Sequence, residues 1–112
     1  MDDILFEVID PRGIIVACSK SQWKQHIISA HQEVENKLDI VKDTVEKPDK
    51  IYASAEYQER DVYIKEMSRK NLYMKVIVEF PNNRGNVVTS FIQTGVRGNI
   101  NMEAVKYYKP EL

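Results

Sequence analysis

The sequence predicts an α+β domain: an N-terminal β-hairpin, then two helices packed on one face of a twisted antiparallel sheet of about four strands. Three observations predict this class. Two short apolar runs open the chain, and residues 22–46 carry apolar side chains at helical spacing. After Pro48, apolar and polar residues alternate with the two-residue period of strands.

The length and composition indicate one ordinary globular domain. The chain has 112 residues, 43% of them hydrophobic and 29% charged, which suits a single domain over residues 1–112. No apolar run approaches the roughly 18 residues of a membrane span, and the acidic start at Asp2 and Asp3 is unlike a signal peptide. We therefore expect a cytoplasmic protein without a membrane partner, in which Cys18 is a buried small hydrophobe. The net charge of −1 argues mildly against strong nucleic-acid binding.

The first two apolar runs, Ile4–Ile9 and Ile14–Cys18, are separated by the turn sequence Asp10-Pro11-Arg12-Gly13. Proline fixes the first central dihedral of a turn, and glycine supplies a positive φ. The pattern predicts a β-hairpin.

Helical spacing begins after Ser19 or Ser21, either of which is a suitable N-cap. The apolar stripe runs as far as Val45, and Pro48 ends it because proline has no N–H to donate. The stripe fits one helix from about Gln22 to Glu46, or two helices that break near His31-Gln32-Glu33. We prefer two, because about 25 residues is long for a helix in a small domain.

Four strands are expected after Pro48, at residues 51–54, 62–65, 72–80 and 87–93, with a hairpin turn at 81–86. Alternation places Leu72, Met74, Val76, Val78 and Phe80 on the face that meets the helices. The opposite face is then left with Tyr63, Lys65, Tyr73 and Lys75. Residues 96–112 carry weak signals and are assigned to a loose tail with a short helical turn at Met102–Lys106.

The only two histidines, His26 and His31, lie five residues apart in the predicted helical segment. On an ideal helix this separation corresponds to about 140° around the axis, so the two rings do not stack. The spacing differs from the i, i+4 pair of helical zinc sites, and no cysteine stands at motif spacing. We therefore expect no metal and no cofactor. On spacing alone, both histidines are more typical of structural or surface residues.

Several stretches together resemble a known family. They are "SQWKQHIISAHQEVENKLDIVKDTVEKPDKIYAS", "RDVYIKE", "YMKVIVEF" and "NVVTSFIQTG". They are similar in order and spacing to small phage- and prophage-associated domains grouped with the barnase–EndoU–colicin–RelE (BECR) class of metal-independent RNases. The resemblance covers roughly residues 4–95. One departure is Gln32, where the family usually has proline after the second histidine.

The resemblance implies an endoribonuclease or RNA-binding domain of phage or toxin type. Metal-free RNA cleavage needs proton transfer to and from oxygen atoms and a cation near the phosphate. His26 and His31 are the candidates for proton transfer, Lys75 for the cation, and Thr89 for a hydrogen bond to a phosphate oxygen. Candidates for positioning RNA or stacking on a base are Arg60, Tyr63 and Tyr73. The implied partners are RNA and a cognate inhibitor protein.

Each of these side chains also has an ordinary structural interpretation. Lys75 is typical of a solvated strand face, Thr89 of any strand, and Tyr63 with Tyr73 of a cross-strand aromatic pair. Arg60 lies between Glu59 and Asp61, as in a surface charge cluster. Two alternatives to a nuclease therefore stay open: a non-catalytic binding or regulatory module on the same fold, and a homo-oligomeric structural protein. The sequence leaves the oligomeric state undetermined.

Overall fold

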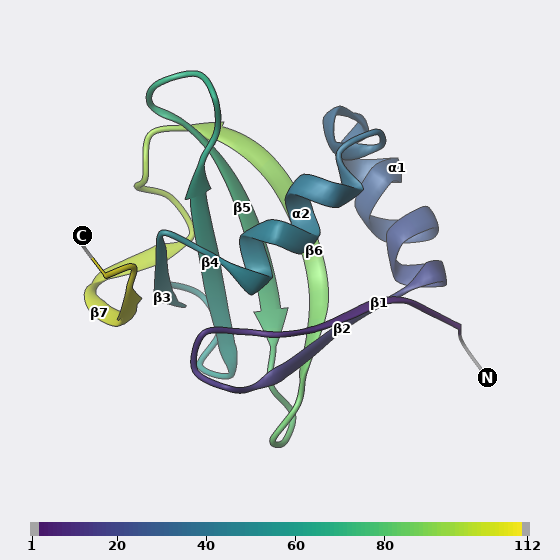
Figure 1. Ribbon diagram of the computed structural model, residues 1–112, viewed down its shortest axis with the longest axis horizontal. Helices are drawn as coiled ribbons and strands as arrows, with labels where there is room; N and C mark the ends of the chain where they lie inside the picture. The colour runs from purple at the N-terminus through teal and green to yellow at the C-terminus, as the bar shows by residue number, and fades with distance from the viewer. Residues whose placement is uncertain (1–2, 111–112) are drawn as a thin grey trace.

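A seven-stranded mixed sheet dominates the structure, a computed structural model that describes residues 3–110 (Figure 1). The strands follow the spatial order β1-β2-β6-β5-β4-β3-β7. All neighbours are antiparallel except β2 and β6, which pair in parallel over two residues each. The strands are β1 (Ile4–Ile9), β2 (Ile15–Ser19), β3 (Lys50–Ser54), β4 (Arg60–Glu66), β5 (Leu72–Glu79), β6 (Gly85–Thr94) and β7 (Ile100–Tyr108).

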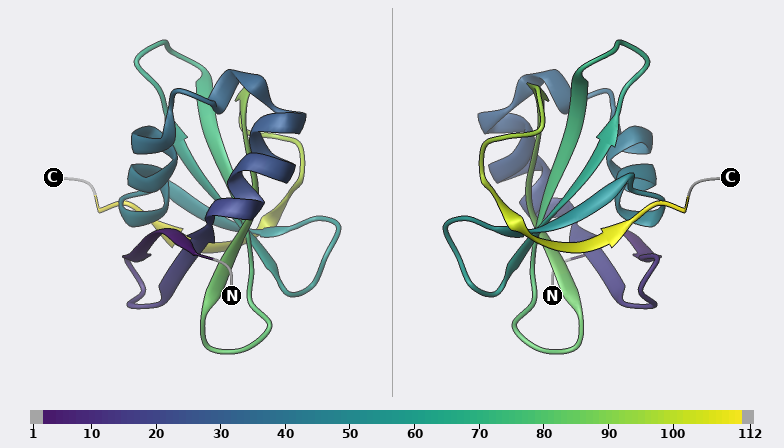
Figure 2. Two further views of the ribbon diagram at one scale, coloured as in Figure 1. Left: turned by 90° about the vertical axis from the view of Figure 1, so that its right-hand side faces the viewer. Right: turned by 90° about the vertical axis from the view of Figure 1, so that its left-hand side faces the viewer.

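The helical residues lie between β2 and β3, on one face of the sheet (Figures 1 and 2). They comprise η1 (Gln22–Ile27), a π-helix, followed by α1 (Ile28–Ala30), the 3₁₀ turn η2 (Gln32–Val34) and α2 (Leu38–Glu46). The chain leaves helical geometry at His31, whose ψ is 77°. The break therefore falls where the two-helix alternative places it, although the first segment is wound mainly as a π-helix.

The predicted fold class, two helices on an antiparallel sheet of about four strands, is wrong. The N-terminal hairpin belongs to the main sheet, because Val16 and Ala17 of β2 pair in parallel with Gly85 and Asn86 of β6. At the other edge, β7 pairs with β3, so the residues assigned to a tail and a helical turn form a nine-residue strand. Only one residue of β7, Ile100, is buried, so this edge strand carries no clean alternation of buried and exposed residues.

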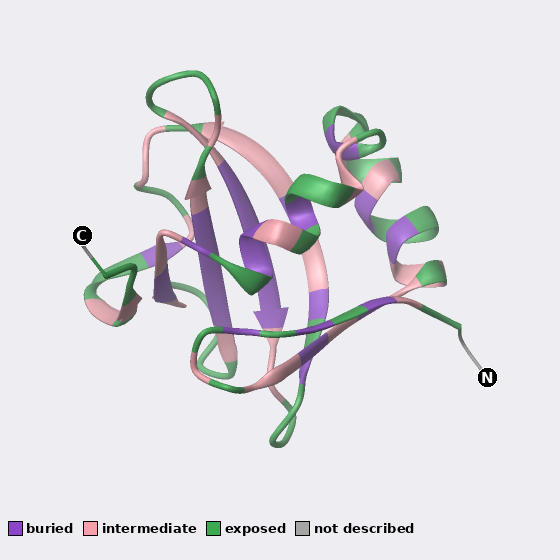
Figure 3. Cartoon of the chain, in the orientation of Figure 1, coloured by how far each residue is buried: buried purple, intermediate pink, exposed green. Residues whose placement is uncertain are grey.

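The main core lies between the helices and the sheet, where Figure 3 shows buried residues gathered on β4 and β5. Met74, Val76 and Val78 point into it, as the alternation of β5 predicts. Cys18 is buried, also as expected. Val41 and Val45 of α2 are fully buried against the same cluster. Most of the sheet's stabilising apolar burial is therefore on this side.

A second, smaller apolar cluster lies on the opposite face and comprises Tyr52, Val62, Ile64, Ile77 and Ile100. It exists because the sheet twists strongly, so that β7 crosses steeply in front of β4, β5 and β6 (Figure 2, right). The polar face predicted opposite the helices is consequently divided: its β3–β7 side is covered, and its β6 side is open. We call the side of β4, β5 and β6 that points away from α2 the outer face.

Candidate functional site

The outer face carries polar side chains in adjacent rows. Arg60 of β4 is opposite Glu79 of β5, and Thr89 of β6 is opposite Ile77. The next row along pairs Phe91 with Lys75. At about 3.3 Å per residue, the three rows span about 13 Å along β5. This length matches about two nucleotides of an extended strand of RNA, and the strip offers charge, a hydroxyl and an aromatic ring together.

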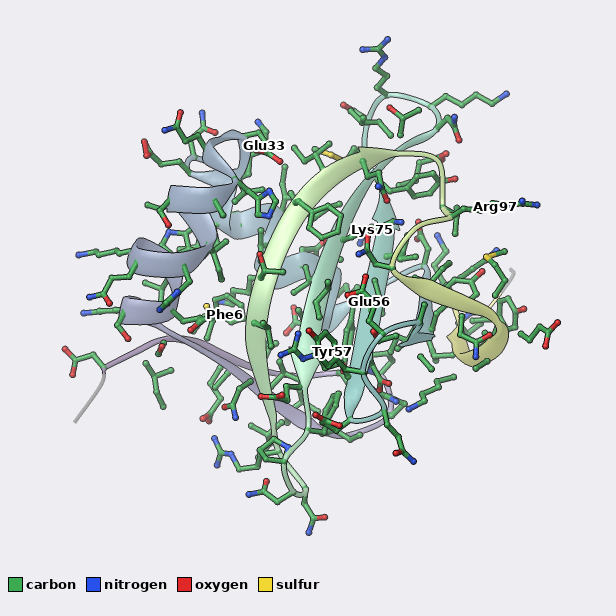
Figure 4. All side chains as sticks on the ribbon, turned by 180° about the vertical axis from the view of Figure 1, so that it is seen from behind. Phe6, Glu33, Glu56, Tyr57, Lys75 and Arg97 are labelled. Atoms are coloured by element: carbon green, nitrogen blue, oxygen red, sulfur yellow. The ribbon has the colours of Figure 1, made fainter. Side chains whose placement is uncertain are left out.

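Arg60 is the cation at one end of this strip. Its Nε lies 3.5 Å from Glu79 Oε1, and its Cζ lies 4.0 Å from the centroid of the Tyr57 ring. Tyr57 is 48% exposed and comes from the β3–β4 loop, which folds over the outer face (Figure 4). The guanidinium is thus held between a carboxylate and an aromatic ring, with most of its remaining N–H groups unbonded within residues 3–110.

His31 stands at the other end, where the helical segment reaches the edge of β6. Its ring centroid is 5.3 Å from that of Phe91, and its Nδ1 is 3.7 Å from Glu33 Oε2. The side chain is 34% exposed. Gln22 of η1 bonds to β6 as well, because its Nε2 donates to the carbonyl oxygen of Val88 at 2.6 Å. The structure therefore brings His31 to the rim of the outer face, next to the row of Thr89.

Lys75 also points to the outer face, but its ammonium is buried. The residue has no exposed surface, and Nζ lies 2.5 Å from Gln93 Oε1 and 2.6 Å and 2.9 Å from the carbonyl oxygens of Val96 and Gly98. Burial lowers the pKa of Lys75 to about 8. An ammonium has only three protons to donate, so Lys75 is fully engaged in holding the β6–β7 connection. It is not the solvated strand residue that the sequence suggests.

His26 is not brought to this strip by any contact. It is exposed on η1, and it makes none of the side-chain hydrogen bonds, ion pairs or ring contacts found within residues 3–110. Tyr73 lies on the outer face at its far end, opposite Glu66 and Gln93. Burial and the neighbouring Glu66 raise the pKa of Tyr73. The four candidate catalytic side chains therefore do not form one site. His31 and Thr89 belong to the accessible strip, the Lys75 ammonium is buried, and His26 makes no contact with the strip.

Tyr63 faces the helices rather than the outer face, and its cross-strand partner is Val76, not Tyr73. Its hydroxyl donates to Asp10 Oδ2 at 2.5 Å and accepts from Arg12 Nη2 at 2.9 Å. Burial and the hydrogen bond to Asp10 raise the pKa of Tyr63 above its ordinary range. Tyr63 is thus a neutral, buried group that joins the N-terminal hairpin to β4, and it is not accessible for stacking on a base.

Sequence reasoning missed Tyr57 and Glu79 as members of the strip. Glu79 lies at the end of β5, and its partner across the sheet depends on the strand register, which the sequence alone does not determine. Tyr57 lies in a loop, where no periodicity indicates a direction. The available signal was the run Glu59-Arg60-Asp61, whose alternation sends Arg60 to one face and its two acidic neighbours to the other.

Comparison of the chain with family models, with curated proteins and with solved structures finds no match. Every helix within residues 3–110 is too short or too polar to cross a membrane. The same residues contain no group of three histidine, cysteine or acidic side chains placed to hold a metal ion. Fold and site together define a small mixed-sheet domain with a helix-covered face and a partly open face of polar and aromatic side chains.

Proposed function

We propose that the outer face binds single-stranded RNA and cleaves it by metal-independent proton transfer. In this proposal Arg60 and Thr89 contact the phosphate, Tyr57 and Phe91 offer rings to the bases, and His31 transfers a proton. The observation that carries the proposal is the placement of Arg60, Thr89 and His31 along one strip of the sheet. Exposed aromatic rings beside a cation are the usual means of holding unpaired bases and their backbone.

The cleavage step uses the 2′-hydroxyl of RNA as nucleophile. A base takes the 2′-hydroxyl proton, O2′ attacks phosphorus, and the bond from phosphorus to O5′ breaks. An acid returns a proton to O5′, which leaves a 2′,3′-cyclic phosphate and a free 5′-hydroxyl. Glu79 is the nearest carboxylate to the Arg60 end, and His31 stands at the opposite end of the strip. The strip spans about 13 Å along β5, so Glu79 and His31 do not reach the same phosphate. We assign His31 to one of the two proton transfers and solvent water to the other, and Arg60 to stabilising the charge on the phosphate oxygens of the bound strand.

A second candidate function is RNA binding without cleavage. The observation that favours it is the state of Lys75, whose ammonium is enclosed by acceptors and does not reach a phosphate on the outer face. On this account the strip keeps its affinity for RNA through Arg60 and the aromatic rings, and His31 is a packing partner of Phe91.

The test measures cleavage and binding of one fluorescent oligoribonucleotide in EDTA, with wild type, His31→Ala and Arg60→Ala. His26→Ala is the matched control, since it removes the same side chain from an exposed position of the helical segment, where it makes no side-chain hydrogen bond, ion pair or ring contact within residues 3–110. We expect His31→Ala to lower the cleavage rate by about 10²–10⁴-fold, the usual contribution of a general acid or base. Arg60→Ala should lower both cleavage and affinity, and His26→Ala should behave as wild type.

The outcomes separate the two functions. Equal background cleavage by all four proteins, with weaker binding by Arg60→Ala alone, removes the catalytic assignment and leaves the binding one. Absence of binding by wild type removes both. Thermal unfolding of each variant shows whether a lost activity reflects a lost fold.

A further inference from the structure

A cavity of about 400 Å³ lies between the N-terminal hairpin, the start of β4 and the edge strand β7. Its lining includes the charged residues Arg12, Glu59, Asp61 and Lys106, together with the ring of Phe80. Nothing in the proposed RNA site uses these groups. The cavity combines charge and an aromatic wall, which is the usual composition of a site for a small polar group.

Arg12 is a fixed part of the cavity wall. Its Nη2 lies 3.0 Å from Asp10 Oδ2 and 2.9 Å from the Tyr63 hydroxyl, and its Nη1 lies 3.0 Å from Asp61 Oδ2. Its Cζ is also 5.6 Å from the centroid of the Phe80 ring. A guanidinium held by two carboxylates, a phenol and a ring has little freedom to turn toward a ligand. Arg12 therefore organises the cavity but does not itself offer a free cation.

Asp61 is the incompletely satisfied group. It is only 2% exposed, and while Oδ2 accepts from Arg12, Oδ1 accepts no hydrogen bond from any residue within 3–110. Lys106 Nζ stands 2.7 Å from Oδ1 as an ion pair, outside the angles of a hydrogen bond. Its side chain is 42% exposed and comes from the edge strand β7. The Lys106 ammonium can turn out into solvent, whereas the Asp61 carboxylate cannot, and a buried carboxylate oxygen without a hydrogen bond is costly.

The balance of charge favours a cation as the occupant. The lining holds the carboxylates of Glu59 and Asp61 against the cations of Arg12 and Lys106. Asp10 lies outside the lining and neutralises Arg12, so an excess of negative charge remains. A guanidinium is better suited than an ammonium, because its planar set of N–H donors matches a carboxylate edge and stacks on an aromatic ring. The side-chain amides of Gln58, Asn82 and Asn83 also line the cavity and offer acceptors for the remaining donors.

We propose that this cavity binds the guanidinium of an arginine side chain presented by a protein partner, which displaces Lys106 and bonds to Asp61 Oδ1. In the free protein, the Lys106 ammonium forms the ion pair with Asp61 that the partner's guanidinium forms in the complex. The residues that line this site are separate from those assigned to RNA binding on the outer face.

The test titrates wild type and variants with N-acetyl-arginine methylamide and follows the side-chain amide NMR signals of Asn82 and Asn83. We expect weak, saturable binding at millimolar concentration, as befits a single side chain. Lys106→Gln should bind about three- to tenfold more tightly, because it removes a competing cation. Glu59→Gln, which removes an exposed carboxylate, should bind more weakly by a similar factor. Lys109→Gln is the matched control, since Lys109 pairs with Asp49 outside the cavity and should leave the affinity unchanged.

Three results would overturn the proposal. The first is no shift of the Asn82 and Asn83 signals with the arginine probe in either wild type or Lys106→Gln. The second is Lys106→Gln binding no more tightly than wild type. The third is equal shifts with N-acetyl-glutamine methylamide, which carries no charge. None of these depends on RNA, so a failure here is distinguishable from a failure of the outer-face proposal.

Discussion

Replacing Lys75 with methionine tests the buried ammonium directly. Methionine is similar in length to the lysine stem, but it cannot donate to Gln93 or to the carbonyl oxygens of Val96 and Gly98. The variant also removes the only titrating atom at this position. Comparing it with wild type therefore isolates how the protonation of Lys75 contributes to the free energy of unfolding.

The sign of the effect follows from the lowered pKa of Lys75, about 8 in the folded chain against an ordinary 10.5. Between these two values the unfolded chain binds a proton at Lys75 that the folded chain does not. The free energy of unfolding therefore rises with pH across this window, by at most about 1.4 kcal/mol per pH unit. Integrated from pH 7 to pH 9.5, the gain of wild type relative to Lys75→Met is about 2 kcal/mol.

The assay is urea unfolding of both proteins at pH 7 and pH 9.5, with the difference between the two proteins compared across pH. Lys24→Met, an exposed substitution on η1, controls for the general loss of positive charge and should follow wild type. A difference between wild type and Lys75→Met that stays constant with pH, or that changes in favour of the variant, would contradict a lowered pKa of Lys75 in the folded chain.

Two further substitutions test the packing around the same sheet. Tyr63→Phe removes the hydroxyl between Asp10 and Arg12, and should lower the free energy of unfolding by about 2–4 kcal/mol, measured in urea, because two charge-assisted hydrogen bonds are lost in the interior; a loss below about 0.5 kcal/mol would show that the phenol is not needed there. Gly85→Ala places a methyl group 2.6 Å from Val78 Cγ1 and 2.7 Å from Phe80 Cε1, and should lower stability by about 1–3 kcal/mol through overpacking, visible as a lower Tm. An unchanged Tm would mean that the junction of β2, β5 and β6 is looser than the structure describes.

Most strands were predictable because their patterns are local. The alternation over residues 72–80 fixes which side of β5 meets the helices, and the turn at Asp10-Pro11-Arg12-Gly13 places Gly13 at a positive φ of 85°. The strand count was not predictable in the same way. The parallel contact of β2 with β6 joins segments about 70 residues apart, and β7 is an edge strand whose exposed side carries no periodic signal.

The candidate site was predictable only in part, for a similar reason. Residue type alone made Lys75 and Tyr63 attractive as functional groups, but burial decides what a charged or phenolic group does, and burial follows from partners far along the chain. Lys75 meets carbonyl groups 21–23 residues away, and Tyr63 meets Arg12 at a separation of 51 residues. His31 and Thr89 were proposed from a family pattern, and their roles remain predictions.

Cleavage through the 2′-hydroxyl is tested by comparing two oligonucleotides that differ in one oxygen atom. One is all RNA, and the other carries a 2′-deoxy sugar at the cleavage position; both are incubated with wild type in EDTA. We expect the RNA to be cut to a 2′,3′-cyclic phosphate, while the deoxy-substituted strand binds with similar affinity and is not cut at that position. Cleavage of both strands at equal rates, or binding of neither, would contradict the assignment of the outer face as an RNA site that uses the 2′-hydroxyl.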